Sequence, residues 1–323
     1  MDHHVTSLEM NERAWAIADE CARRSVEMRI DVRTLACGSR VIDAGITVAG
    51  GLAAGCAIAE MCMGGLGHVT LSPVIIGPET WPGVQVWTDH PATACMASQY
   101  AGWAISPEGY FAMGSGPLRS AARVERELFD KLRYTEEPSR GVLVLEGRAA
   151  PTDFVAEWVA SKANISPEHL TFVIAPTASL AGGVQVVTRT IETGLHKMDT
   201  LGFDVNRVVS AIGMAPLPPV AKNDLRAMGR TNDCVLYGGR AHYTVDATDD
   251  ELSALADQLP SSSCPAYGSP FLDIFERHDR DFYKIDPMLF SAAEVWLTST
   301  SSGRTFRGGQ LHADILRASL YGS

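Results

Sequence analysis

The sequence lacks the short motifs that mark several common catalytic sites. It has no HExxH motif and no cluster of cysteine and histidine at zinc-binding spacing, so we do not expect a metal-activated water. It also has no GxSxG nucleophile turn and no GxxxxGK[ST] phosphate loop. The glycine-rich run at residues 50–55 reads GGLAAG, and it lacks both the GxGxxG spacing and an acidic residue about 20 positions further on. The sequence therefore predicts no metal ion, no phosphate loop and no nicotinamide cofactor.

Paired cysteines and positive charge are also scarce. The seven cysteines are an odd number, none is spaced as CxxC, and most lie in apolar or Gly/Ala surroundings. This pattern favours reduced thiols in a cytoplasmic protein over a disulfide framework. The formal net charge of −11 argues against a nucleic-acid partner, because a phosphate backbone requires a basic surplus.

No hydrophobic run is long enough for a membrane span. The uncharged stretch at residues 45–59 is shorter than the ~20 residues that a membrane helix needs, and an acidic residue follows it. Its small residues Gly51, Gly55 and Ala59 recur at four-residue spacing, which in a soluble chain indicates a helix packed closely on a neighbour. Residues 1–13 lack the apolar core of a signal peptide. We therefore expect neither membrane insertion nor a secretory signal.

Strand-like and helix-like segments alternate along the chain, which predicts a mixed α/β fold. A length of 323 residues exceeds that of a typical single domain, and a polar linker interrupts the pattern at residues 134–140. We therefore predict two α/β domains, at residues 1–135 and 141–323, whose terminal segments can cross over between them. The expected helices include residues 11–28, 52–62, 118–132, 152–163, 179–201, 249–259 and 310–321, and the expected strands include residues 69–76, 84–88, 141–146, 170–175 and 232–238.

The amphipathic pattern at residues 179–201 predicts one long helix with three ionisable side chains on its polar face. Apolar residues recur there at three- and four-residue steps, between a capping serine and a glycine. Arg189, Glu192 and His196 project from the opposite face. The pattern is typical of a solvated helix face with an ordinary salt bridge. It also suits a carboxylate base that an adjacent cation keeps ionised and oriented, although the spacing alone favours the first interpretation.

Three segments combine glycine, polar and aromatic residues more specifically than plain loops do. They are residues 97–103, 110–117 and 229–234, which read ASQYAGW, YFAMGSGP and GRTNDC. In the second segment a Gly-Ser-Gly-Pro sequence precedes a predicted helix, so its backbone N–H groups can bind an anion together with Arg119. A tight turn leading into a helix explains the same glycines equally simply.

Taken together, these segments resemble those of methenyltetrahydromethanopterin cyclohydrolases, pterin-dependent one-carbon enzymes of methanogens and methylotrophic bacteria. The resemblance covers essentially the whole chain. It rests on the order and spacing of these three segments together with three others. The others are MCMGGLG at residues 61–67, PTAS at residues 176–179 and RTIET at residues 189–193. One departure is Ala44, where a cysteine is expected in the IDxG turn.

The resemblance implies two α/β domains with a wide pocket between them, assembled as a homotrimer, without a metal or redox cofactor. It implies a reaction that interconverts a 5,10-methenyltetrahydropterin cation and its 5-formyl derivative by adding or losing water. It also implies that Arg189 and Glu192 are the catalytic pair, with Glu192 as the base. A different pterin enzyme such as a formyl transferase is one alternative. A non-catalytic carrier of a reduced pterin is another, although a carrier has no need of this pair.

The pterin of this family carries a phosphate and carboxylates on a long tail, and an acidic protein must offset that charge locally. Pterin edges also require paired donors and acceptors, so we expect contacts from the polar segments. The candidate substrate-binding residues are Gln99, Tyr100, Ser115, Gly116, Arg119, Arg230, Asn232 and Asp233. Hydrogen bonds that stabilise loops are the alternative role for several of them.

Overall fold

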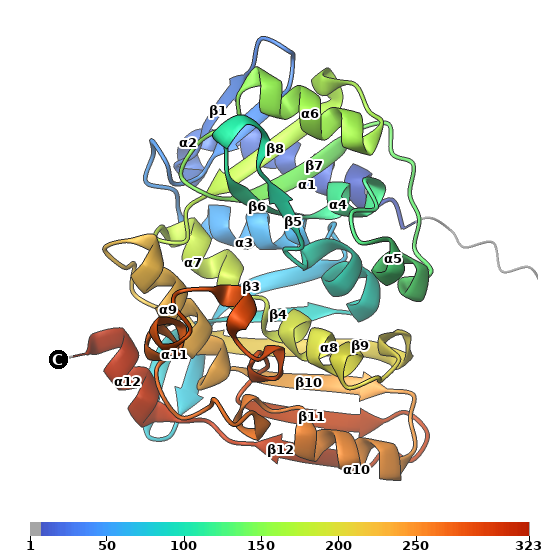
Figure 1. The fold of residues 1–323 in the computed structure, drawn as a ribbon, viewed down its shortest axis with the longest axis vertical. Helices are drawn as coiled ribbons and strands as arrows, with labels where there is room; N and C mark the ends of the chain where they lie inside the picture. The colour runs from blue at the N-terminus through green and yellow to red at the C-terminus, as the bar shows by residue number, and fades with distance from the viewer. Residues whose placement is uncertain (1–7, 323) are drawn as a thin grey trace, which may run out of the picture.

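The computed structural model describes residues 8–322, so most of the N-terminal segment considered above lies outside the described part of the chain. Two mixed sheets of six strands each lie one above the other (Figure 1). The upper sheet, in the order β1-β2-β8-β7-β6-β5, consists of β1 (Asp31–Thr34), β2 (Arg40–Asp43), β8 (Leu170–Ala175), β7 (Gly141–Glu146), β6 (Ala112–Ser115) and β5 (Trp103–Ile105). The lower sheet, in the order β12-β11-β10-β9-β4-β3, consists of β12 (Thr305–Gly309), β11 (Glu294–Ser299), β10 (Arg240–Val245), β9 (Val208–Pro216), β4 (Glu79–Thr88) and β3 (Gly67–Ile76). The predicted mixed α/β class is confirmed.

The centre of the upper sheet is parallel, whereas the lower sheet is mostly antiparallel. In the upper sheet β8 runs parallel to both β2 and β7. Every residue of β8 is buried, and β7 is buried except at its last residue. These two strands were predictable because parallel strands covered on both faces are continuous apolar runs. In the lower sheet only β10 and β11 pair in parallel among the described strands.

The two sheets do not follow the predicted division at residues 134–140. The upper sheet joins β1, β2, β5 and β6 from before this stretch to β7 and β8 from after it. The lower sheet joins the hairpin of β3 and β4 to four strands that follow residue 200. The stretch itself is tied down, because Glu136 accepts hydrogen bonds from the backbone N–H and the side chain of Asn11.

Helices cover the sheets and fill the space between them (Figure 1). The α-helices are α1 (Met10–Arg23), α2 (Ser25–Met28), α3 (Leu52–Cys62), α4 (Pro117–Ala121), α5 (Arg126–Leu132), α6 (Asp153–Ala163), α7 (Leu180–Val187), α8 (Thr190–Thr200), α9 (Asp224–Leu236), α10 (Asp249–Gln258), α11 (Phe271–Arg277) and α12 (Ala313–Tyr321). A π-helix, η1 (Ala92–Gln99), precedes β5. Short 3₁₀ turns are η2 (Pro107–Gly109), η3 (Pro167–His169), η4 (Val205–Arg207), η5 (Ser261–Ser263), η6 (Phe282–Lys284) and η7 (Pro287–Leu289).

Close packing of α3 on α7 joins the two layers. A Cβ atom added at Gly55 would lie 2.6 Å from the Cβ of Val184 and 3.0 Å from the carbonyl oxygen of Ala181. Only glycine permits this approach, so the prediction of a closely packed helix from the small-residue spacing is confirmed.

Four sequence predictions of secondary structure were wrong. The helix expected at residues 11–28 is divided at Arg24 into α1 and α2. The helix expected at residues 179–201 is broken into α7 and α8, because the hydroxyls of Thr188 and Thr190 donate to the carbonyls of Gln185 and Val187 at 2.6 and 2.8 Å. The helix expected at residues 118–132 is interrupted between α4 and α5, where Arg123 has a φ of 46°. The strand expected at residues 232–238 lies mostly in helix α9, whose N-cap Asn223 accepts a hydrogen bond from the N–H of Arg226.

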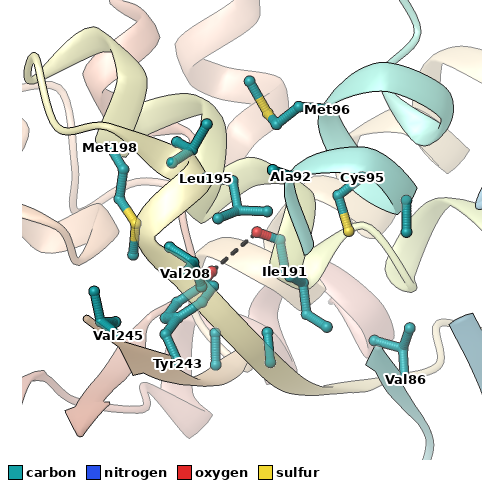
Figure 2. Packing of buried hydrophobic residues seen from close by; sticks show 14 of the residues in the cluster. Val86, Ala92, Cys95, Met96, Ile191, Leu195, Met198, Val208, Tyr243 and Val245 are labelled. Carbon is teal, nitrogen blue, oxygen red and sulfur yellow. Dashed lines mark hydrogen bonds between the residues drawn. The ribbon is translucent and has the colours of Figure 1, made fainter. Parts of the chain in front are cut away.

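The apolar face of α8 packs between η1 and the lower sheet (Figure 2). Ile191, Leu195 and Met198 are fully buried there. Tyr243 of β10 rises under the helix and donates a 2.9 Å hydrogen bond to the carbonyl oxygen of Ile191 (Figure 2). Gly194 lies directly above the Tyr243 hydroxyl, and a Cβ at this position would overlap it. This packing fixes the height and rotation of α8 over the sheet.

We predict that Gly194→Ala destabilises the protein by about 2–4 kcal/mol, because Tyr243 must move and its hydrogen bond to Ile191 is lost. Urea unfolding followed by circular dichroism measures the change. Gly183→Ala in α7 is the matched control, since a Cβ there meets only Leu217, at 4.0 Å. That control should gain up to about 1 kcal/mol from helix propensity. Equal stability of the two variants would contradict this account of the packing.

Candidate active site

Arg189 and Glu192 lie at the break between α7 and α8, where the helices of the lower layer meet the upper sheet. The described structure buries both side chains, with exposed fractions of 8% for Arg189 and 5% for Glu192. Because α8 packs on β9 and β10 while Arg189 reaches Ser115 of β6, the site joins the two sheets. The interpretation as a solvated helix face is therefore wrong, since burial removes both groups from bulk water.

The guanidinium of Arg189 is held by three acceptors from three elements. It donates to the backbone carbonyl of Gln99 at the end of η1, to the hydroxyl of Ser115 at 3.3 Å and to the amide oxygen of Gln185 in α7 at 3.2 Å. Arg189 is the N-cap residue of α8, with φ −76° and ψ 9°, so its side chain leaves the helix axis in the direction of η1. Within residues 8–322 it forms no ion pair with Glu192 at 4.0 Å or less, contrary to the adjacency that an unbroken helix predicts.

Burial decides the protonation of Glu192. Removal of the carboxylate from water raises its pKa above the ordinary value, and this effect outweighs the positive charges of Arg189, His196 and Arg119, which favour ionisation. The sequence left open which effect is larger. Glu192 also lies in the first turn of α8, where the helix dipole stabilises a negative charge. The result is a carboxyl group whose pKa is higher than that of an exposed glutamate.

Gln99 and Tyr100 border this pair. The Gln99 side chain is fully buried, its Nε2 is 3.5 Å from the Thr188 hydroxyl, and its Oε1 has no hydrogen-bond partner in the described part of the chain. The Tyr100 ring packs against the His196 imidazole with 5.1 Å between ring centroids. Burial raises the pKa of the Tyr100 hydroxyl. An orphaned amide oxygen beside aromatic rings is suited to a polar, planar ligand.

The Gly-Ser-Gly-Pro segment and Arg119 lie beside the pair, but Arg119 is already occupied. Gly116 has a φ of 99° and donates its N–H to the Ser98 carbonyl at 2.8 Å. Arg119 is fully buried, pairs with Glu125 at 2.6 Å and donates to the Met96 carbonyl. Desolvation lowers its pKa. The Arg119 guanidinium therefore holds η1 and Tyr100 in place, and it is not free to bind the anionic tail of a pterin.

Arg230, Asn232 and Asp233 are not brought to the Arg189 region by any described contact. Arg230 donates to the Pro219 carbonyl at 3.3 Å, and Asn232 donates to the Met228 carbonyl within α9. The buried carboxyl of Asp233 accepts hydrogen bonds from the N–H of Phe271 and the hydroxyl of Ser319, so it ties α9 to α11 and α12. Burial raises the pKa of Asp233 to about 7.

Two surface hollows lie away from the pair. A hollow of about 710 Å³ opens beside α4, α5 and α6, and a smaller one lies between α7 and the start of α9. Neither is lined by Arg189 or Glu192. Across residues 8–322, no three histidine, cysteine, aspartate or glutamate side chains gather to ligate a metal ion. None of the described helices has the length and apolar content to cross a bilayer.

Comparison with known proteins identifies the family. The model of the family described as Cyclohydrolase (MCH) matches residues 9–320. A methenyltetrahydromethanopterin cyclohydrolase of Methylobacillus flagellatus is 48% identical over 294 residues, which cover 91% of this chain and 89% of the relative. Relatives of the same name in Methanocaldococcus jannaschii and Methanococcoides burtonii are 39% and 36% identical, each over 97% of this chain and 98% of their own length. The chain belongs to the methenyltetrahydromethanopterin cyclohydrolase family.

Within this family member, sequence reasoning missed Gln185 and Thr188. Gln185 is 3% exposed and shares the Arg189 guanidinium with Gln99 and Ser115. A signal was present, because residues four apart on a helix are neighbours and Gln185 precedes Arg189 by four positions. Thr188 carried no signal, since its role depends on a break in the helix that periodicity does not reveal.

We predict that Glu192→Gln raises thermal stability at neutral pH. The folded protein penalises an ionised Glu192, because burial raises its pKa above the ordinary value of a glutamate, whereas glutamine carries no charge. The penalty is absent below the unfolded pKa and grows as the pH rises towards the folded pKa. The melting temperature of Glu192→Gln should therefore match the parent near pH 4 and exceed it at pH 7–8. A variant that melts below the parent at pH 8 would contradict the assigned direction of the pKa.

Proposed function

We propose that this chain interconverts a 5,10-methenyltetrahydromethanopterin cation, or a close pterin analogue, and its 5-formyl derivative by adding or losing water in one-carbon metabolism. Family membership supports the reaction. The single structural observation that carries it is a buried glutamate, Glu192, which follows in the same helical segment a buried arginine that three other groups hold in place. The substrate supplies its own electrophile, because the methenyl carbon belongs to an amidinium.

The chemistry requires a positioned water and a group that exchanges protons with it. Glu192 accepts a proton from the water as the oxygen bonds to the methenyl carbon. The tetrahedral adduct then breaks its bond to N10, which takes that proton back from Glu192. The adduct hydroxyl passes its own proton to the regenerated Glu192 carboxylate as the formyl carbonyl forms. Arg189 stays protonated throughout and stabilises the ionised carboxylate. Positioned acid–base catalysis of this kind contributes ~10²–10⁴-fold in rate, and most when the pKa lies near the working pH.

Gln99 and Tyr100 are the substrate contacts that the geometry supports, whereas Gly116 donates its N–H to Ser98 and the Ser115 hydroxyl binds Arg189. The unpartnered Oε1 of Gln99 can accept from a pterin N–H, and the Tyr100 ring can pack on a planar ring. Arg119 acts here as a buried support for Tyr100, whose ring lies 5.2 Å from its guanidinium carbon. The contacts of Arg230, Asn232 and Asp233 within α9, α11 and α12 give no support for a role in binding.

Assembly as a homotrimer in the cytoplasm completes the proposal. The trimer follows from the family resemblance, and light scattering of the purified protein tests it. The seven cysteines are free, and five of them are buried, as expected of thiols in a reducing compartment.

One assay separates the proposal from its two alternatives. Loss of the methenyl chromophore is followed with the methenyl pterin and with its folate analogue, without any added acceptor. Turnover without an acceptor supports the cyclohydrolase. Turnover only in the presence of an amine acceptor would identify a formyl transferase, and binding without turnover would identify a carrier.

We predict that Glu192→Gln lowers kcat by ~10²–10⁴-fold while KM changes little, because the variant keeps the hydrogen-bonding shape but cannot accept a proton. Steady-state loss of the methenyl chromophore measures both constants. Glu157→Gln, on the exposed face of α6, is the matched control and should retain full activity. Near-parental turnover of Glu192→Gln would overturn the assignment of the base.

We predict that Arg189→Lys lowers kcat by roughly tenfold or more although the charge is retained. One ammonium group on a flexible stem cannot hold Gln99, Ser115 and Gln185 in the fork geometry of a guanidinium, so Glu192 loses a fixed neighbour. The pH dependence of kcat should shift together with the pKa of the Glu192 carboxyl group. Ser115→Ala removes one of the three partners and should cost less than Arg189→Lys.

A further inference from the structure

The proposed reaction releases one proton for each turnover, and the buried site must export it. A methenyl cation and a neutral water become a neutral formyl product, so charge balance leaves one proton behind. After the steps above, that proton resides on the Glu192 carboxyl. Glu192 is 5% exposed, so it cannot pass the proton directly to bulk water at a free surface. The inference below rests on the proposed function.

Most neighbours of Glu192 cannot accept this proton. Arg189 and Arg119 are permanently protonated. Cys95 and Tyr243 are buried against the same helix, and desolvation raises the pKa of both groups, that of Tyr243 well above its usual value of 10. Both therefore already hold their protons at neutral pH. Tyr243 is also committed to the Ile191 carbonyl.

His196 has the chemistry and the position that the others lack. It follows Glu192 by four residues in α8, so the two side chains lie one above the other on the same helix face. The charge of a protonated His196 acts on the Glu192 carboxyl. The imidazole is half-buried, and its ring packs on Tyr100, which holds it at the edge of the site. Imidazole is the side chain that exchanges protons most readily near neutral pH.

We propose that His196 is the proton relay between Glu192 and solvent. The carboxyl proton of Glu192 passes through a bridging water to the unprotonated ring nitrogen of His196, and the other ring nitrogen releases its proton to bulk water. Glu192 is left as a carboxylate, ready for the next water. In the reverse direction His196 takes up a proton from solvent and delivers it to Glu192. The imidazole does not touch the reacting carbon, so it acts through Glu192.

The other charged and titratable groups facing this corner do not offer a competing route. They are Tyr100 at the end of η1, Arg119 of α4, Glu125 before α5, Tyr283 of η6 and Asp199 of α8. Glu125 is paired with Arg119, and Asp199 is paired with Lys131 at 3.1 Å. Burial raises the pKa of Tyr100, and Tyr283 is 89% exposed on the solvent side. Only His196 combines a position beside Glu192 on the same helix face, contact with Tyr100 and partial exposure to solvent.

The test is chemical rescue of His196→Gln. At saturating substrate and low buffer concentration, kcat should fall by roughly ten- to a hundredfold, within the range of acid–base effects, while KM stays within about twofold. Added imidazole should restore kcat in proportion to its concentration, because a small base can replace the relay. The parent enzyme should not respond to the buffer. A purely structural role for His196 predicts a loss that imidazole does not restore.

Two further variants keep the result interpretable. His68→Gln, on the outer face of the lower sheet, is the matched control and should behave as the parent at every buffer concentration. His169→Gln, at an exposed position of η3, is a second control and should also keep the parent's independence of buffer. A His196→Gln enzyme with parental kcat at low buffer, or with a loss that no buffer restores, would overturn the relay. Absence of turnover in the parent enzyme would instead overturn the proposed function.

Discussion

The guanidinium of Arg189 is the group on which the arrangement of the site depends. A buried cation is tolerated only when its donors are satisfied, and this one is satisfied by η1, by β6 and by α7 at the same time. Those three elements belong to different parts of the chain and to both layers of the fold. Their acceptors therefore fix the distance between the upper sheet and the start of α8, and with it the place of Glu192.

The break between α7 and α8 makes this geometry possible. In an unbroken helix Arg189 would point along the same face as Glu192 and pair with it, and the carboxylate would be strongly ionised. The hydroxyls of Thr188 and Thr190 donate hydrogen bonds to backbone carbonyls of the preceding turn. The Arg189 side chain then points towards Gln99 and binds its carbonyl oxygen. The positive charge of Arg189 then acts on the Glu192 carboxyl group without forming an ion pair with it. Burial dominates its protonation, and a group with a raised pKa both accepts and returns a proton readily. The cost of this arrangement is a loss of stability, because an ionised carboxylate is kept where it is poorly hydrated.

The sequence predicted the regular parts of the fold well and the polar parts poorly. Strands β7 and β8 and helix α3 have the predicted bounds, because their apolar patterns directly indicate burial. The run at residues 232–238 was misread, since short apolar stretches suit a strand or a buried helix equally. The role of Asp233 as a link to Phe271 and Ser319 needed elements that lie far along the chain.

The same limit explains the site. Periodicity placed Arg189, Glu192 and His196 on one face, but it could not state whether water or another element covers that face. The family resemblance favoured a catalytic pair over a solvated helix face without information on tertiary contacts. The partners Gln99 and Ser115 lie 90 and 74 positions from Arg189 and became neighbours only through tertiary structure.

The interleaving of strands has a consequence for how the chain acquires its structure during synthesis. The hairpin of β3 and β4 is made early, but its neighbour β9 begins more than a hundred residues later. The edge of β4 that later receives β9 therefore stays open while the ribosome completes β7, β8, α7 and α8. The first half of the chain alone does not contain all the strands of either sheet. The corner that holds Glu192 and Arg189 therefore gains its support from the lower sheet only after β9 and β10, on which α8 packs, have been made.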